Sequence, residues 1–213
     1  MERINRVKRD RLTSRDKGMI KLASTPTVFR ETNNPDKCLI IPVVSSEKRN
    51  NIPMGFIDKN TISTNANLIM PDASLFHFGI LMSKMHMTWV KSVCGRLKSD
   101  FRYSRDIVYN NFPWPENSTE KQIMSIENAA QSVLDARKKY SNSSLSDLYD
   151  PLAMKTNLFK AHQDLDKAVD LAYRPQPFAS EANRMEFLFG LYEKYTADLF
   201  TNVKEKKQKN KKK

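Results

Sequence analysis

The spacing of the hydrophobic residues changes near Pro115, and this change divides the chain into two parts. Before Pro115, short β-branched apolar runs alternate with turn-forming residues, which predicts strands at residues 38–44, 52–57, 61–63 and 67–70. The connections between these runs are too short to hold crossover helices. We therefore expect a small, mostly antiparallel sheet.

Three other segments of this first part do not fit that pattern. Residues 2–21 are strongly charged and have a weak helical pattern, which predicts a basic helix. Between residues 73 and 94 the apolar positions recur at steps of three and four, which predicts one helix packed on the sheet, with Asp72 as its N-cap and Gly95 as its stop. Residues 107–115 predict a last strand that is ended by two prolines.

After Pro115 the apolar stripes have the helical period, and they predict three helices separated by proline-containing linkers. Thr119, Ser146 and Ser180 are candidate N-caps. The predicted fold class is therefore α+β, a small mostly antiparallel sheet with a packed helix, followed by an all-α helical domain. The predicted units are a first domain at 1–115, a helical domain at 116–203 and a disordered Lys-rich tail at 204–213.

Positive charge is concentrated at the two ends of the chain. The net charge is +12, while residues 1–21 hold eight Lys or Arg against three acids, and residues 204–213 hold seven Lys against one acid. Clustered cations gain affinity for polyanions by releasing phosphate counterions, so this distribution favours a polyanionic partner. Lys-rich tails are usually solvated segments, which leaves the role of residues 204–213 open.

The sequence shows no membrane span, disulfide framework or zinc site. Its longest nearly uncharged stretch, residues 66–83, does not reach the roughly 20 apolar residues of a spanning helix, and the charged N-terminus does not resemble a secretion signal. We therefore predict a cytoplasmic protein with no membrane partner. Cys38 and Cys94 are expected to be reduced and buried. The three histidines lack Cys or His partners at the spacing that zinc sites use.

The motifs that catalysis on DNA would require are also missing from the sequence. Base methylation needs a glycine-rich loop for the methyl donor and an Asn/Asp-Pro-Pro-aromatic motif for the flipped base, and neither occurs. Asp36, Glu47 and Lys48 match the two acids and the lysine of a magnesium-dependent nuclease poorly. We therefore predict no catalytic residue, no metal site and no cofactor in this chain.

Polar and basic segments remain, and they suit a nucleic acid. Residues 45–51 (SSEKRNN) carry side chains that discriminate base edges, although an ordinary hairpin loop has the same composition. Residues 95–105 interleave four cations with two aromatics, which is typical of contact with a nucleic-acid backbone or of a solvated loop. The candidate phosphate contacts are Arg96, Lys98, Arg102 and Arg105, with Arg9 and Arg11 of the basic N-terminal helix.

Several long segments of the chain form recognisable motifs. They are residues 72–81 (DASLFHFGIL), 85–90 (MHMTWV), 93–104 (VCGRLKSDFRYS), 108–115 (VYNNFPWP), 134–137 (LDAR), 148–154 (LYDPLAM) and 160–170 (KAHQDLDKAVD). These segments closely resemble the C-terminal part of the MmeI-like enzymes, which are single-chain type II restriction-modification proteins, and the resemblance extends from Arg3 to about Leu199. Motifs of this length are specific, whereas the Lys-rich end after Val203 lies outside the family pattern.

The resemblance implies a DNA target-recognition domain followed by the helical C-terminal domain of that family. Glu47, Arg49 and, as a third residue, Asn51 match its base-reading positions. The expected partners are double-stranded DNA and a methyltransferase domain or subunit. S-adenosylmethionine and magnesium are expected only in the nuclease and methyltransferase parts that lie upstream in the family.

Two alternatives stay open on the sequence alone. The basic ends could belong to an interaction module that binds RNA or a membrane surface without sequence choice. The chain could also be an inactive remnant or a split subunit of a longer enzyme. Neither the DNA target nor the oligomeric state follows from the residues.

Overall fold

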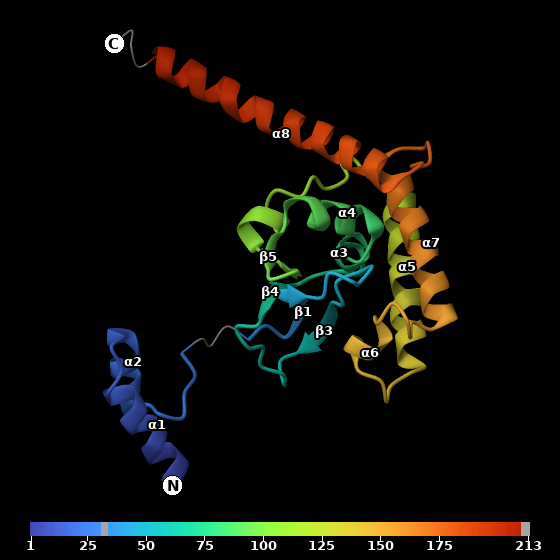
Figure 1. The fold of residues 1–213 in the computed structure, drawn as a ribbon. Coiled ribbons are helices and arrows are strands. Elements are labelled where there is room, and N and C mark those ends of the chain that lie inside the picture. Colours follow the sequence, from blue (N-terminus) through green and yellow to red (C-terminus); the bar gives the residue numbers. More distant parts are fainter. Residues whose placement is uncertain (31–33, 210–213) are drawn as a thin grey trace. The chain divides into compact units, whose positions relative to one another are not determined.

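The computed structural model describes residues 1–30 and 34–209, which form two compact units, 1–36 and 37–213 (Figure 1). The first unit contains α1 (Glu2–Leu12), α2 (Lys17–Lys21) and a 3-10 turn at Leu22–Ser24. Arg11 fastens α1 to the following turn, because its guanidinium donates to the carbonyls of Leu22, Thr25 and Val28 at 2.7–2.9 Å. The predicted basic helix is confirmed for its first eleven residues.

The second unit begins with a three-stranded antiparallel sheet in the order β3-β1-β4. Leu39 and Ile41 on the central strand point into the core, as the two-residue period of a strand requires. The strand predicted at 61–63 is wrong, because these residues belong to the turn-rich connection before the last strand. The strands are β1 (Lys37–Pro42), β3 (Gly55–Asp58) and β4 (Asn67–Pro71).

A second small sheet has the order β2-β6-β5, and all its pairs are antiparallel. Residues 95–102 of the basic segment form a hairpin, a structure that the sequence did not predict. Its two strands are joined by the turn Lys98-Ser99, and the register pairs Arg96 with Phe101. The strands are β2 (Val44–Ser45), β5 (Gly95–Leu97) and β6 (Asp100–Arg102).

Two helices, α3 (Leu75–Leu81) and α4 (Lys84–Val93), replace the single helix predicted between residues 73 and 94. The break occurs because Ser83 caps the second helix, its Oγ accepting from the His86 N–H at 3.3 Å. The first helix is capped by Ser74 instead of Asp72, which takes a left-handed conformation with φ 54°. Ser83 therefore marks the break between the two helices, although the regular spacing of the apolar residues around it predicts one continuous helix.

The last strand predicted at residues 107–115 is wrong, because Arg105–Tyr109 forms one turn of π-helix instead. Two tertiary interactions hold this turn. The Trp89 indole donates to the Val108 carbonyl at 3.0 Å, and the Val108 side chain is fully buried. A β-branched residue can be buried in a helical turn as well as in a strand, so the apolar run alone did not decide between them.

The remaining residues are helical, and α5 and α7 lie side by side (Figure 1). Thr119 is confirmed as an N-cap, because its Oγ1 accepts from the Gln122 N–H in a capping box. Ser146, expected as an N-cap, lies inside the short helix α6, and Ser144 is the cap of that helix. The helices are α5 (Glu120–Lys138), α6 (Leu145–Leu148), α7 (Thr156–Tyr173) and α8 (Glu181–Lys209).

One hydrophobic core continues across Pro115, where the sequence analysis places a domain border. Gly79 of α3 shows how closely the two parts approach, since an added Cβ would lie 2.6 Å from Ile126 Cγ2 of α5. The border at Pro115 stays a prediction. Helix α8 includes residues 204–209 of the Lys-rich tail, and residues 210–213 lie outside the described residues. No helix in the described ranges is long and apolar enough to cross a membrane.

Candidate nucleic-acid interface

The polar loop (residues 46–51) leaves the second sheet beside the β5–β6 hairpin. The Glu47 N–H donates to Asp100 Oδ1 at 3.2 Å, and Ser45, just before the loop, pairs with Phe101 of β6. The side chains of Glu47 and Lys48 are exposed. The structure therefore brings the predicted base-reading segment and the basic hairpin together.

The last residue of the polar loop and the residue just before the loop are buried, whereas the middle of the loop is exposed. Asn51 is only 6% exposed, and its amide donates to the Met82 carbonyl at 2.8 Å. Ser45 is also buried, at 3% exposure. This position corrects the expectation for Asn51, because a side chain engaged inside the protein cannot meet a base edge. We leave Asn51 out of the interface.

Arg49 has a partner that no sequence argument indicated. Its Nη2 donates to Ser146 Oγ at 2.7 Å, a contact that joins residues 97 positions apart. Ser146 lies on α6, so a helix after Pro115 holds a side chain of the polar loop. Two residues so distant in sequence, both in polar segments, give no sign of this pairing.

The hairpin does not present all its cations on one face. Arg96 lies over the Phe101 ring at 4.0 Å and donates to the Ser99 carbonyl at 3.0 Å, so part of this side chain shields an apolar residue. Lys98 is exposed at the turn, where it takes a left-handed backbone conformation with φ 57°. Arg102 neighbours Phe101 on the same strand and therefore points to the opposite face.

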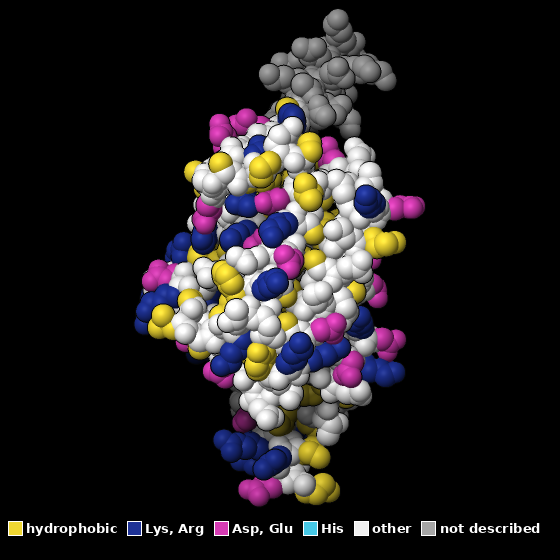
Figure 2. All heavy atoms as spheres, turned by 90° about the vertical axis from the view of Figure 1, so that its right-hand side faces the viewer, with side chains coloured by type: hydrophobic (Ala, Val, Ile, Leu, Met, Phe, Trp, Pro, Cys, Tyr) yellow, Lys and Arg dark blue, Asp and Glu magenta, His cyan; other side chains and the backbone are white. Residues whose placement is uncertain are grey.

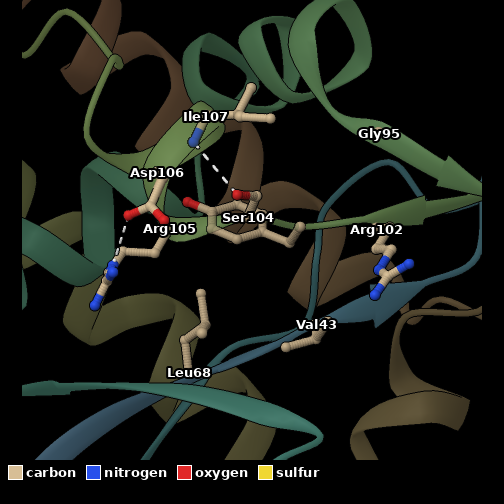
Figure 3. Close-up of a pocket in the computed structure, with 9 residues that line it drawn as sticks. Val43, Leu68, Gly95, Arg102, Ser104, Arg105, Asp106 and Ile107 are labelled. Carbon is tan, nitrogen blue, oxygen red and sulfur yellow. Dashed lines mark hydrogen bonds and ion pairs between the residues drawn. The ribbon is translucent and has the colours of Figure 1, made fainter.

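On that opposite face, Arg102 and Arg105 line a groove of about 470 Å³ (Figure 3). Val43 and Leu68 form part of its apolar floor. Arg105 is exposed and paired with Asp106, whose Oδ1 lies 2.8 Å from the Arg105 Nε, and this bond lowers the pKa of the Asp106 carboxyl. The groove therefore has one cation without a carboxylate neighbour among its lining residues, Arg102, and one that is locally neutralised.

The two remaining candidates, Arg9 and Arg11, both belong to the first unit. Arg9 is exposed on α1. Arg11, in contrast, has its guanidinium committed to three backbone carbonyls of the same unit. These three hydrogen bonds give Arg11 a structural role in the first unit that requires no contact with a phosphate.

A buried network lies beneath the polar loop and ties it to the helices. Arg137 of α5 is 8% exposed, and it donates to the Met54 carbonyl at 2.7 Å and to the Tyr149 hydroxyl at 2.9 Å. The Tyr149 hydroxyl is in turn 2.7 Å from His162 Nε2. The chain that follows the polar loop is thereby fixed to three helical segments.

Buried ionisable groups around this core have displaced pKa values. Burial lowers the pKa of His86 to about 4 and that of His162 to about 3, where the charge of Arg137 acts in the same direction. Burial raises the pKa of Asp166 to about 6, against the hydrogen bond that it accepts from the Lys84 N–H. Both histidines are therefore neutral at pH 7 and serve as packing and hydrogen-bonding groups.

The face that α5 and α7 form carries both positively and negatively charged side chains. Figure 2 shows Lys and Arg side chains interspersed with Asp and Glu side chains on this side of the molecule. Two exposed ion pairs, Lys138 with Asp135 on α5 and Lys167 with Asp164 on α7, contribute charges of both signs. A surface of this kind does not suit a phosphate backbone. The hairpin side is the better candidate.

The cysteines and acids suggest no chemistry within the described part of the chain. Cys38 and Cys94 are buried and unbonded, and burial raises the pKa of both thiols. Residues 1–30 and 34–209 contain no group of three or more His, Cys, Asp or Glu side chains that could hold a metal ion. What the geometry offers is recognition through an exposed polar loop beside a basic hairpin.

A small antiparallel sheet, an exposed polar loop and a helical brace define a recognition module, and the comparison with known proteins gives its family. The chain belongs to the MmeI family, because the model of the MmeI target recognition domain matches residues 1–116 and that of the MmeI C-terminal domain matches residues 118–200. The family resemblance seen in the sequence and the predicted α+β class are both confirmed.

Two relatives show how much of a longer protein this chain corresponds to. DNA methyltransferase A of Bacillus subtilis (strain 168) is 45% identical over 196 residues, which is 92% of this chain and 22% of that protein. The solved structure of the Type IIL restriction-modification enzyme MmeI in complex with DNA is 47% identical, with a TM-score of 0.85, over 92% of this chain and 26% of that one. The chain thus spans about a quarter of the length of these relatives.

Proposed function

We propose that this chain is the sequence-reading part of a restriction-modification system and that it binds double-stranded DNA through the polar loop and the β5–β6 hairpin. The observation that carries the proposal is the bond between the Glu47 N–H and Asp100, which places exposed polar side chains directly beside exposed cations. Such a division suits a surface that specifies with one segment and grips with the other. The family assignment supports the same function.

Glu47 and Arg49 are the residues we assign to base readout. An arginine recognises guanine by donating to O6 and N7, and a glutamate accepts from cytosine N4, both in the major groove. Two such side chains, two positions apart on the polar loop, fit the two bases of one G·C pair. Neither residue has its carboxylate or guanidinium bound inside the core.

Lys98 and Arg102 are the strongest candidates for phosphate contacts in the second unit, and Arg96 adds a cation on the far side of the hairpin. Arg105 ranks below them, because Asp106 neutralises it. Exposed Arg9 is the candidate from the first unit. These contacts would set affinity and salt dependence without choosing a sequence.

We assign the chemical steps on DNA to methyltransferase and nuclease parts outside this chain. In our proposal, a methyltransferase domain or subunit receives the target adenine, which it flips out of the helix while this module holds the site. S-adenosylmethionine and magnesium would act in those parts, and the work takes place in the cytoplasm. Alone, the chain binds DNA and does not react with it.

Selection from random duplex DNA tests the proposal, with and without a methyltransferase partner. We expect one sequence to be enriched, and we expect Arg49→Ala to lose about 1 to 3 kcal/mol at one base pair of it while the other pairs keep their preference. Titration against single-base-pair variants of the enriched duplex measures this. Enrichment of no sequence, or an equal loss on every duplex and on scrambled competitor, would replace readout by non-sequence-specific binding.

A further inference from the structure

The helical end of the chain contacts the polar loop at a functional side chain. Arg49 Nη2 donates to Ser146 Oγ at 2.7 Å, and both residues lie at the surface. A guanidinium has five N–H donors. The bond to Ser146 uses one of them and leaves enough for a bidentate contact with a base.

Helix α6, which carries Ser146, is fixed in place although it is short. A capping box joins Ser144 and Asp147 at its start, where Ser144 Oγ donates to Asp147 Oδ2 at 2.7 Å. At its end, Leu148 and Tyr149 are 4% and 3% exposed and anchor it in the core. Ser146 is therefore presented from a rigid element.

The same element also packs on the chain that follows the polar loop. Leu145 Cδ1 lies 3.5 Å from the position that a Cβ on Gly55 would occupy, so the Leu145 side chain lies close to the start of β3. Tyr149 accepts from Arg137, which donates to the Met54 carbonyl. The loop exit and α6 thus form one block, and the Arg49 guanidinium is held at its surface.

We propose that Ser146 is a positioning residue for sequence choice, so that the helical part of the chain contributes to which base pair is read. This inference rests on the proposed function of Arg49. A free arginine side chain samples many rotamers, and ordering it on DNA costs conformational entropy. A guanidinium that Ser146 already orders loses less freedom on binding, and a wrong base pair cannot recruit it by a different rotamer.

The test compares the full chain and its Ser146→Ala variant on the selected duplex and on duplexes with single base-pair changes. We expect discrimination at the base pair that depends on Arg49 to fall roughly 3- to 10-fold, as for loss of one exposed hydrogen bond to a charged group. Discrimination at the other pairs, affinity for scrambled duplex and the thermal midpoint should stay unchanged. Ser146→Thr should restore most of the loss, because it keeps the hydroxyl.

Matched controls separate this role from a general effect on the surface. Ser141→Ala changes an exposed serine in the connection that precedes α6 and should leave binding to every duplex unaffected. In an Arg49→Ala background, Ser146→Ala should have no further effect, because the side chain that it positions is gone.

Three outcomes would overturn the inference. Wild-type discrimination in Ser146→Ala would show that the contact is irrelevant to readout. Increased affinity for the selected duplex would show that Ser146 restrains Arg49 from DNA. An equal loss on all duplexes would assign Ser146 to binding in general. If Arg49→Ala itself leaves discrimination intact, the proposed function of Arg49 fails first and the inference fails with it, a result distinct from the other three.

Discussion

Arg49 and Arg137 show how the same side chain is used in two regions of this molecule. Arg49 lies on the polar loop at the surface, and its one described bond is to an exposed serine. Arg137 lies below the same loop at 8% exposure, bonded to the Met54 carbonyl and the Tyr149 hydroxyl and packed against the Phe78 and Tyr149 rings. We expect the surface arginine to tolerate replacement without loss of the fold, because the hydrogen bonds of Arg137, unlike that of Arg49, lie inside the core.

The difference shows that exposed side chains of the polar loop can be replaced at little cost in stability, whereas side chains of the buried network cannot. A buried carbonyl or hydroxyl that loses its donor carries the full cost of desolvation, while an exposed group turns to water. The polar loop is therefore open to change at its exposed residues, and the network under it fixes where the loop begins and ends.

Replacing Arg137 should destabilise the protein strongly. We expect Arg137→Met to lower the free energy of unfolding by about 2 to 4 kcal/mol, because it leaves the Met54 carbonyl and the Tyr149 hydroxyl without their donor inside the core. Urea unfolding measures the change. Arg49→Met is the matched control and should change stability by less than about 0.5 kcal/mol. Similar values for both variants would remove the contrast between the two regions.

Mild acid should lower the free energy of unfolding through the buried ionisable groups. His86 and His162 have folded pKa values of about 4 and about 3, below those of the unfolded chain, so stability is lost as the pH falls below the ordinary histidine value. Asp166, with a folded pKa of about 6, acts in the opposite direction, because its folded form takes up a proton first. From pH 7 to pH 5 we expect a net loss of about 2 kcal/mol.

Urea unfolding at pH 7, 6 and 5 measures that loss, and Asp166→Asn provides its control. The variant removes the opposing contribution, so its loss over the same range should be larger by about 1 kcal/mol. Stability that stays flat, or rises, between pH 7 and pH 5 would show that the histidines are not neutral in the folded protein.

The smallest effect is expected at the hairpin turn. Lys98→Ala should weaken binding to all duplexes alike by less than about 1 kcal/mol and reduce the slope of log affinity against log salt by about one unit. Alanine keeps the Cβ, so the backbone strain at φ 57° stays the same and only the charge is lost. Titrations at several salt concentrations measure the slope. A slope equal to that of the parent would exclude Lys98 from the phosphate contacts.

Local sequence signals predicted the structure correctly where they depended only on residues close together in the sequence. The capping box at Thr119 starts α5, and the helical stripes after Pro115 all became helices. The prediction failed at residues 107–115, where the bond from the Trp89 indole to the Val108 carbonyl stabilises a π-helical turn instead of a strand. It also failed at residue 83, where a serine capped a new helix inside an apolar stripe.

The candidate site divides in the same way. The sequence placed Glu47 and Arg49 on a loop and the cations of residues 95–105 near a nucleic acid, and the structure puts these segments side by side. It could not indicate that Asn51 points inward to Met82, because an asparagine suits a buried carbonyl as well as a base edge. It could not indicate Ser146 either.

The sequence by itself determined the family, the α+β class and the order of polar and apolar segments, because periodicity, capping residues and long motifs are properties of neighbouring residues. Only the tertiary structure decided which polar side chains stay exposed and which become part of the core. That choice depends on contacts such as Arg49 with Ser146 and Arg137 with Met54, whose partners lie more than 80 positions apart. No local pattern encodes such distances, since burial of a polar group is favourable only when the whole chain supplies its partner.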